Sequence, residues 1–83
     1  MAPAYPNPFN PLTHIEYSIP TSSMVQITIY DLIGRKLENL VNEKKEPGYY
    51  HVEWDASSIS SGVYLVQMEA DGNQFNQKIV LIK

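Results

Sequence analysis

Apolar and polar residues alternate along several short stretches of this chain. Every second residue is apolar in residues 14–19 and 24–30, and the same pattern recurs in residues 49–54 and 64–70. A period of two is typical of a β-strand with one buried face and one solvent-exposed face. These stretches predict strands, and a further strand is expected over residues 73–82.

Turn signals separate the predicted strands. Residues 20–23 (PTSS) and 47–48 (PG) interrupt the alternation, and proline and glycine are the residues that most often mark turns. The dipeptide DG at 71–72 predicts a two-residue hairpin, because both central positions of that turn need positive φ. Residues 55–61 have no sustained pattern and are expected to connect two strands.

Residues 35–45 carry an ambiguous pattern. Leu37, Leu40, Val41 and Lys44 recur at spacings of three and four, which suits a short amphipathic helix. Strand signals lie on both sides, however, and a sheet formed around a segment often overrides its local preference. We predict a strand here, with a helix as the alternative.

Six or seven short strands separated by turns predict an all-β fold, either a two-sheet antiparallel sandwich or a small barrel. Four aromatic residues share strand faces with aliphatic residues and are expected in the core: Tyr17, Tyr50, Trp54 and Tyr64. Small size limits that core, because a chain of 83 residues forms one domain at most.

The segment before the first predicted strand is rich in proline. Proline lacks an N–H donor and fixes φ, so residues 1–12 are expected to form a semi-rigid linker that leads into a β-sandwich over residues 13–83. Tyr5 and Phe9 are expected to pin this linker against the sandwich. We interpret residues 1–12 as a lead-in from a larger protein, with any export signal further upstream.

Composition excludes several classes of function. The formal net charge is −3 and the basic residues are scattered, whereas nucleic-acid binding needs a concentrated positive face. No apolar run approaches the roughly 20 residues of a membrane span, so membrane insertion is not expected. The absence of cysteine removes disulfides, thiol nucleophiles and cysteine-based metal sites.

Residues that might carry chemistry are few. His14 and His51 are expected to face solvent and have no nucleophile motif nearby. Glu53 and Asp55 resemble a glycosidase pair in spacing, but Asp55 is better explained as the acceptor of an Asx turn. Asp71 starts a hairpin rather than a calcium loop. We therefore predict no enzyme activity, no cofactor and no metal.

Two surface features suggest binding. Tyr30 and Tyr49 fall on the face opposite the predicted core, and exposed rings of this kind can stack on sugars, so a carbohydrate-binding module is one hypothesis. Residues 79–82 are apolar on both faces of their strand. An exposed apolar strand usually has a partner, so a homodimer through the last strand is a second hypothesis.

Several spaced motifs together resemble a known family. In chain order they are YPNPFNP at 5–11, IYD at 29–31 with GR at 34–35, PGYY at 47–50, WD at 54–55, SGVY at 61–64 and KIVLIK at 78–83. The set is similar to the C-terminal sorting domains of type IX secretion cargo, also called the Por secretion tail (type A). The resemblance covers nearly the whole chain.

The resemblance implies an immunoglobulin-like or fibronectin-III-like antiparallel sandwich of about seven strands and a non-catalytic role. It also implies an upstream cargo domain, an outer-membrane secretion translocon that recognises the tail, a surface peptidase of the gingipain type that removes it, and delivery to the cell surface. The family's motif positions carry over to Pro6, Asn7, Pro8, Gly48, Tyr50, Gly62, Tyr64, Lys78 and Lys83.

Part of the pattern is also similar to the immunoglobulin-like module of the flagellar hook-capping protein. The shared parts are FNP at 9–11, WD at 54–55 and SGVY at 61–64. Modules of that kind cap or space filaments. A structural spacer or filament-capping module is therefore the main alternative to a sorting domain.

Overall fold

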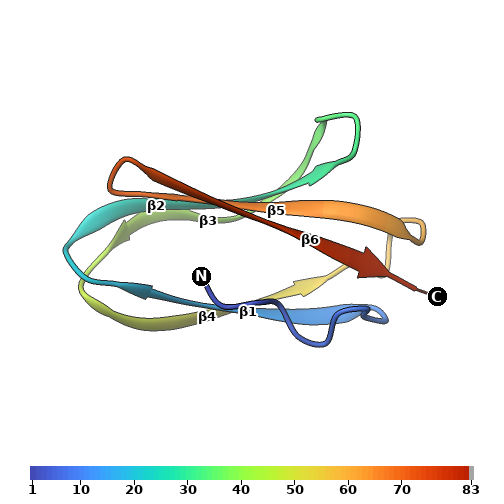
Figure 1. Cartoon of the computed structure of the whole chain (residues 1–83), viewed down its shortest axis with the longest axis horizontal. Coiled ribbons are helices and arrows are strands. Elements are labelled where there is room, and N and C mark those ends of the chain that lie inside the picture. The colour runs from blue at the N-terminus through green and yellow to red at the C-terminus, as the bar shows by residue number, and fades with distance from the viewer. Residues whose placement is uncertain (83) are drawn as a thin grey trace.

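Six antiparallel strands and no helix form within residues 1–82, the part of the chain that the computed structural model describes. The strands are β1 (Leu12–Ile19), β2 (Ser23–Asp31), β3 (Lys36–Lys45), β4 (Gly48–Asp55), β5 (Gly62–Ala70) and β6 (Asn73–Leu81). One sheet has the order β3-β2-β5-β6 and the other pairs β1 with β4. Figure 1 shows the two sheets as stacked layers.

This architecture confirms the predicted all-β fold and is consistent with an immunoglobulin-like sandwich. Residues 36–45 form a strand, so the helix alternative was wrong. The described residues give six strands rather than about seven. The N-terminal segment makes only two isolated bridges, Tyr5 with His14 and Phe9 with Leu81, because prolines at positions 3, 6, 8 and 11 lack the N–H groups that a continuous ladder needs.

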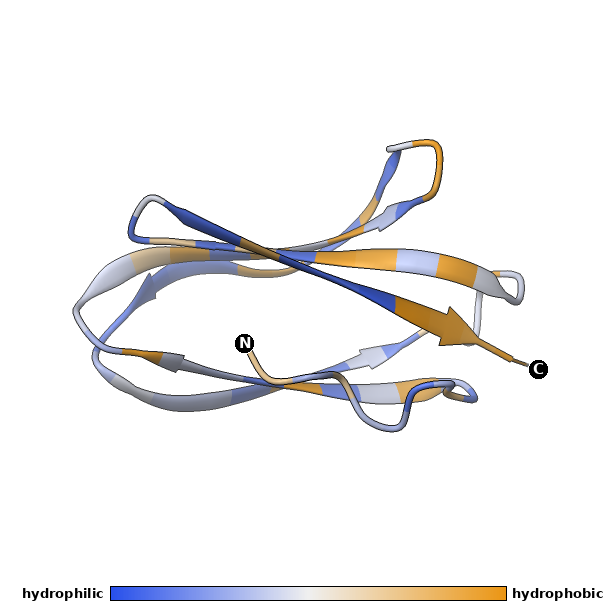
Figure 2. Ribbon diagram, viewed as in Figure 1, coloured by the Kyte–Doolittle hydropathy of each residue, from blue (hydrophilic) through white to orange (hydrophobic). Residues whose placement is uncertain are grey.

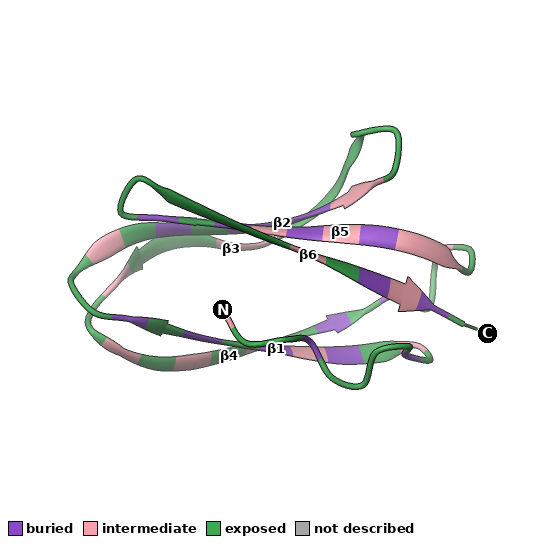
Figure 3. Cartoon of the chain, in the orientation of Figure 1, coloured by how far each residue is buried: buried purple, intermediate pink, exposed green. Residues whose placement is uncertain are grey.

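The core lies between the two sheets. Along β1 and β5 the buried side chains alternate with more exposed ones (Figure 3), as the sequence period predicts. On β2 Val25, Ile27 and Ile29 are buried, and Thr28 between the last two is buried as well. Trp54, Tyr17 and Tyr64 are buried as expected, and Tyr50 is half-buried and packs against them. Trp54 donates its indole N–H to Glu38 on β3 at 2.7 Å, which ties the small sheet to the large one.

The N-terminal segment is bound to both sheets. Along β1, the amide of Ala2 donates to the carbonyl of Glu16, and Tyr5 and His14 exchange two backbone bonds of 2.8 and 3.0 Å. Along β6, the amide of Phe9 donates to Val80 and the carbonyl of Phe9 accepts from Ile82, both at 2.9 Å. Phe9 is 1% exposed and packs in the core.

The hairpin between β5 and β6 has the predicted two-residue turn. Ala70 pairs with Asn73, and Asp71 and Gly72 adopt φ values of 51° and 77°. Both values are positive, as this turn type requires. The calcium-loop alternative therefore has no support in the geometry of these residues.

Candidate functional site

The residues predicted from the family resemblance fall in three regions of the sandwich. Pro6, Asn7 and Pro8 lie in the N-terminal segment, Gly48 with Tyr50 and Gly62 with Tyr64 begin two strands, and Lys78 lies on β6. Lys83 lies outside the described residues. The structure brings Asn7 beside Lys78, but it does not gather all the described positions into one cleft.

Gly48 with Tyr50 and Gly62 with Tyr64 form the same local structure twice. The hydroxyl of Tyr50 donates to the carbonyl of Glu46 at 2.6 Å, and that of Tyr64 donates to the carbonyl of Ser60 at 2.5 Å. In each case the acceptor lies four residues earlier. This arrangement is the tyrosine corner of immunoglobulin-like sandwiches, and it closes the loop that precedes each strand.

The glycines complete these corners. Gly48 and Gly62 both have a φ of +156°, and the nearest side-chain atoms of Tyr50 and Tyr64 lie 3.8 and 3.9 Å from where a Cβ would stand. That contact distance is ordinary, so space does not demand glycine. The backbone conformation does, because side-chain-bearing residues rarely adopt it.

Asn7 is the N-terminal residue with the clearest role. Its side-chain amide donates to the carbonyl of Lys78 at 3.1 Å, and its side-chain oxygen accepts the amide of Val80 at 3.0 Å. The Asn7 side chain thus makes the two hydrogen bonds to the outer edge of β6 that the backbone of a neighbouring strand would make. The neighbouring carbonyl of Pro6 accepts a hydrogen bond from the buried Thr13 hydroxyl.

Lys78 belongs to the outer face of the large sheet. Lys78 on β6 pairs with Leu65 on β5, and Leu65 pairs with Tyr30 on β2. Val63 on β5 pairs with Val80 on β6 nearby. The apolar members of this row are half-buried. In the apolar run at residues 79–82, alternate side chains face the core. Ile79 and Leu81 are buried, whereas Ile82 is half exposed.

The turn between β2 and β3 presents a surface that the sequence pattern did not single out. It projects beyond the two layers (Figure 1), and its tip is hydrophobic (Figure 2). Leu32 and Ile33 are 65% and 78% exposed. Such adjacent exposed aliphatic side chains are unusual in a turn, where polar residues are the rule. The signal was present in the sequence as the pair LI directly before Gly34.

Asp31 holds this turn rigid. One carboxylate oxygen accepts the amides of Ile33 and Arg35, and the other accepts the Arg35 guanidinium at 2.8 Å. These bonds, led by the Arg35 amide, hold the pKa of the Asp31 carboxyl below its usual value. The exposed aliphatic pair is therefore carried on a fixed support.

Two histidines that are far apart in sequence meet on the outer face of the small sheet. His14 on β1 and His51 on β4 stack with ring nitrogens 3.4 Å apart, and Glu53 lies 3.6 Å from the same His14 nitrogen. No nucleophile stands beside them in the described hydrogen-bond network. Within residues 1–82 no group of three or more His, Asp or Glu side chains is arranged to hold a metal ion.

The predicted Asx turn at Asp55 is present. Its carboxylate oxygen accepts the amide of Ser57 at 2.9 Å and the hydroxyl of Ser57 at 2.7 Å. These bonds, of which that from the hydroxyl has the larger effect, lower the pKa of Asp55. Asp55 therefore has a structural role in the connection that follows β4, and it does not pair with Glu53.

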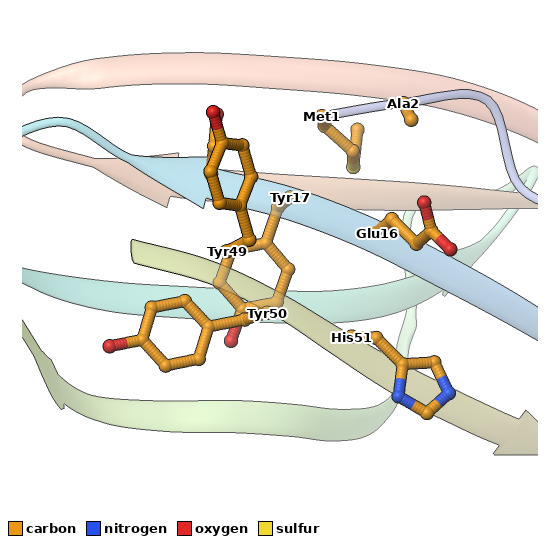
Figure 4. Close-up of a pocket in the computed structure, with 8 residues that line it drawn as sticks. Met1, Ala2, Glu16, Tyr17, Tyr49, Tyr50 and His51 are labelled. Carbon is orange, nitrogen blue, oxygen red and sulfur yellow. The ribbon is translucent and has the colours of Figure 1, made fainter. Parts of the chain in front are cut away.

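A groove of about 640 Å³ runs over the end of the small sheet. Figure 4 shows the rings of Tyr17, Tyr49 and Tyr50 at one end and the side chains of Glu16 and His51 at the other. Tyr49 is 92% exposed. The groove thus combines an aromatic half with a polar half.

Comparison with known proteins identifies the family. Residues 3–83 match the secretion system C-terminal sorting domain. The chain belongs to this family. No curated protein and no solved structure matches it significantly. The sorting domain is thus assigned by its sequence family, and the relation to the flagellar hook-capping module is not shown.

Family membership fixes the general role of the sorting domain. It is a C-terminal sorting signal for type IX secretion, and its family is non-catalytic and is exported to the cell surface or the extracellular space. An upstream cargo and the type IX machinery are the partners that this membership implies. Residues 1–82 contain no helix that is long and apolar enough to cross a membrane.

Gln77 is a residue of the sorting domain that sequence reasoning missed. Its side-chain oxygen accepts the amide of Ala4 at 2.7 Å, and its side-chain nitrogen donates to the carbonyl of Ala2 at 2.9 Å. No pattern in the sequence marks this role, because the bonded residues are 73 and 75 positions apart. Together with Asn7, Gln77 fastens the N-terminal segment to the last strand.

Proposed function

We propose that this sorting domain delivers an upstream cargo protein to the type IX translocon and does no chemistry itself. The family match over residues 3–83 carries the proposal. The arrangement of the histidines supports the non-catalytic part, because His14 contacts His51 and Glu53, and no hydrogen bond described within residues 1–82 joins either histidine to a serine or threonine. Cleavage by a gingipain-type peptidase belongs to the same proposal.

The structure favours two surfaces for contact with the translocon. One is the β2–β3 turn, where Leu32 and Ile33 are exposed on a support fixed by Asp31. The other is the exposed side of β6 at Lys78, and we propose a role for Lys83, which lies outside the described residues, from the family motif alone. We propose that Gly48, Tyr50, Gly62 and Tyr64 contribute to sorting through folding, because all four are engaged in the tyrosine corners.

The bonds of the N-terminal segment affect two further hypotheses, the link to the cargo domain and the homodimer through the last strand. Residues 2–9 are bonded to both sheets, so a flexible link to the cargo domain is expected to precede them. A homodimer through the last strand would be restricted to the first half of β6, since Asn7 and Phe9 occupy the outer edge beside Val80.

A reporter fusion tests the sorting function. The 83 residues are joined to the C-terminus of an exported reporter in a host with a type IX system, and surface delivery is measured. Deleting residues 78–83 would be uninformative, because Ile79 and Leu81 are core residues. The informative variant is the double substitution Leu32→Ser and Ile33→Ser, with Met24→Ser as an exposed apolar control at the other end of β2.

Surface delivery of the unmutated fusion and a reduction of about tenfold in the Leu32/Ile33 variant are expected, since about 1.4 kcal/mol of lost contact weakens binding tenfold. Met24→Ser is expected to be delivered normally. Failure of the unmutated fusion to reach the surface would refute the sorting function. Normal delivery of the double variant would refute only the role of the turn.

A further inference from the structure

We propose that the groove on the small sheet is a binding site for a neutral saccharide. The proposal concerns a site separate from the β2–β3 turn and from Lys78, and it does not depend on the sorting function. The groove volume of about 640 Å³ lies within the range of sites that hold small molecules, which is roughly 300–1,000 Å³.

Tyr49 supplies a free aromatic surface. The other two rings of the groove are already engaged, because Tyr17 and Tyr50 stack at a centroid distance of 5.5 Å and Lys45 lies over the Tyr50 ring. Tyr49 has neither a ring partner nor a hydrogen bond among the described residues and is 92% exposed. A free ring of this kind suits the apolar face of a sugar ring.

Polar groups lie at the right spacing beside that ring. Tyr49 pairs with Ser18 across the sheet, and His51 pairs with Glu16 in the same way. The two pairs are about 6.8 Å apart along the strands and the partners in each pair are about 5 Å apart. A sugar ring stacked on Tyr49 would therefore direct its rim hydroxyls toward Glu16 and His51.

Two of these polar groups are held in place by neighbours, and each has one polar atom without a hydrogen-bond partner among the described residues. Tyr5 donates its hydroxyl to one carboxylate oxygen of Glu16 at 2.8 Å, and no described residue bonds the other oxygen. His51 contacts His14 through Nε2, which leaves Nδ1 without a partner within residues 1–82. A hydrogen-bond acceptor and an imidazole nitrogen are thus held in place for hydroxyl groups.

Charge selects among ligand classes. The Glu16 carboxylate lines the groove, and the protein has a formal net charge of −3, so phosphate-bearing and acidic ligands are disfavoured. Purely apolar ligands would leave Glu16 and His51 without hydrogen bonds. A neutral sugar satisfies both halves of the groove. The groove is open to solvent on one side, so it suits a chain or a terminal sugar.

Affinity electrophoresis of the 83-residue protein tests the proposal. Native gels contain soluble xylan, mannan or mixed-linkage β-glucan as neutral probes and polygalacturonate as an acidic one. We expect at least one neutral polysaccharide to retard the protein. Tyr49→Ala is expected to weaken that retardation about tenfold, which is the upper range for loss of one stacking ring. Tyr30→Ala is the matched control, because Tyr30 lies on the other sheet.

Three results would overturn the proposal: no retardation by any neutral probe, retardation by polygalacturonate alone, or equal losses in Tyr49→Ala and Tyr30→Ala. Chemical-shift changes confined to Tyr49, His51 and their neighbours on titration with the retarding sugar would support it further. A variant that fails to fold is recognised by its circular dichroism, and Glu16→Gln then replaces it. None of these outcomes bears on delivery by the type IX system.

Discussion

At the scale of single residues, the hydrogen bonds of the hydroxyl groups distinguish two structural tyrosines from a surface tyrosine. Tyr50 and Tyr64 each close a loop onto a carbonyl four residues earlier, whereas the ring of Tyr49 projects into solvent. Alternation along the strands already separates Tyr49 from the two core-facing tyrosines. The structure adds the hydrogen bonds by which Tyr50 and Tyr64 close their loops.

Tyr64→Phe is expected to lower the free energy of unfolding by about 0.5–1.5 kcal/mol, because it removes one hydrogen bond and leaves the ring in place. Urea denaturation of the purified protein measures the change. Tyr49→Phe is the matched control and is expected to be neutral within about 0.5 kcal/mol, since the Tyr49 hydroxyl bonds no described residue. Equal effects of the two substitutions would contradict the structural role of the corner.

The carboxyl of Asp31 links stability to pH. Its pKa is lower in the folded protein than the ordinary value of 3.8, chiefly because it accepts the Arg35 amide. A lowered folded-state pKa means that the charged form stabilises the fold above the unfolded pKa, and that this stability is lost as the pH falls through the folded pKa. The loss is therefore expected below about pH 4.

Asp31→Asn is expected to flatten the dependence of stability on pH in that acidic range, because the amide keeps the acceptor oxygen and loses the charge. Urea midpoints measured from about pH 6 down to about pH 2 give the curve. Asp55→Asn is expected to act in the same direction, since bonds from Ser57 lower the pKa of Asp55. A curve identical to that of the unmutated protein would argue against this role of Asp31.

At the scale of elements, the strands could be predicted and their partners could not. Alternation of apolar and polar residues marks β1, β2, β4 and β5, since each has one face in the core. It fails for β3, which has no buried residue. Its residues Leu37, Leu40 and Val41 therefore recur without a clear period of two.

The candidate sites depend on register, which a single sequence does not encode locally. His14 meets His51, and Tyr49 joins Glu16 in one groove, because β1 pairs with β4 in one particular alignment. The binding of Gln77 to Ala2 and Ala4 likewise joins opposite ends of the chain. The corners were partly predictable, because the two glycines and their tyrosines share one spacing.

The attachment of the N-terminal segment to β6 is expected to stabilise the fold, and Gln77 allows this to be tested. Gln77→Ala removes two hydrogen bonds and is expected to lower stability by about 1–3 kcal/mol. Amide exchange at Ala4 is expected to become faster, which NMR can follow. Asn76→Ala is the control on the same strand, because Asn76 is exposed and makes no described side-chain bond. Unchanged protection of the Ala4 amide would show that Gln77 is dispensable.

At the scale of the whole molecule, one side of the sandwich is covered and the other is open. The N-terminal segment lies along the edges of β1 and β6, whereas no described segment pairs with the outer edges of β3 and β4. Charged residues protect β3, which carries Lys36, Glu38, Glu43, Lys44 and Lys45. Charges on an edge strand discourage pairing with other chains.

Removing residues 1–9 is expected to abolish cooperative unfolding, because the deletion takes Phe9 out of the core. Loss of a buried phenylalanine side chain alone costs about 3–5 kcal/mol, while small domains have roughly 5–15 kcal/mol in total. Urea denaturation followed by tryptophan fluorescence reports the transition. Phe9→Leu is the control and should retain a cooperative transition at lower stability. Normal unfolding of the truncated protein would show that the segment is only a linker.

The ties between residues 2–9 and residues 77–82 also set the order of events when the chain is made. A polypeptide that still lacks β6 has no partner for the side chain of Asn7 and the backbone of Phe9, and β5 then pairs with β2 alone. The complete folded state is therefore expected only once residues 77–82 have left the ribosome.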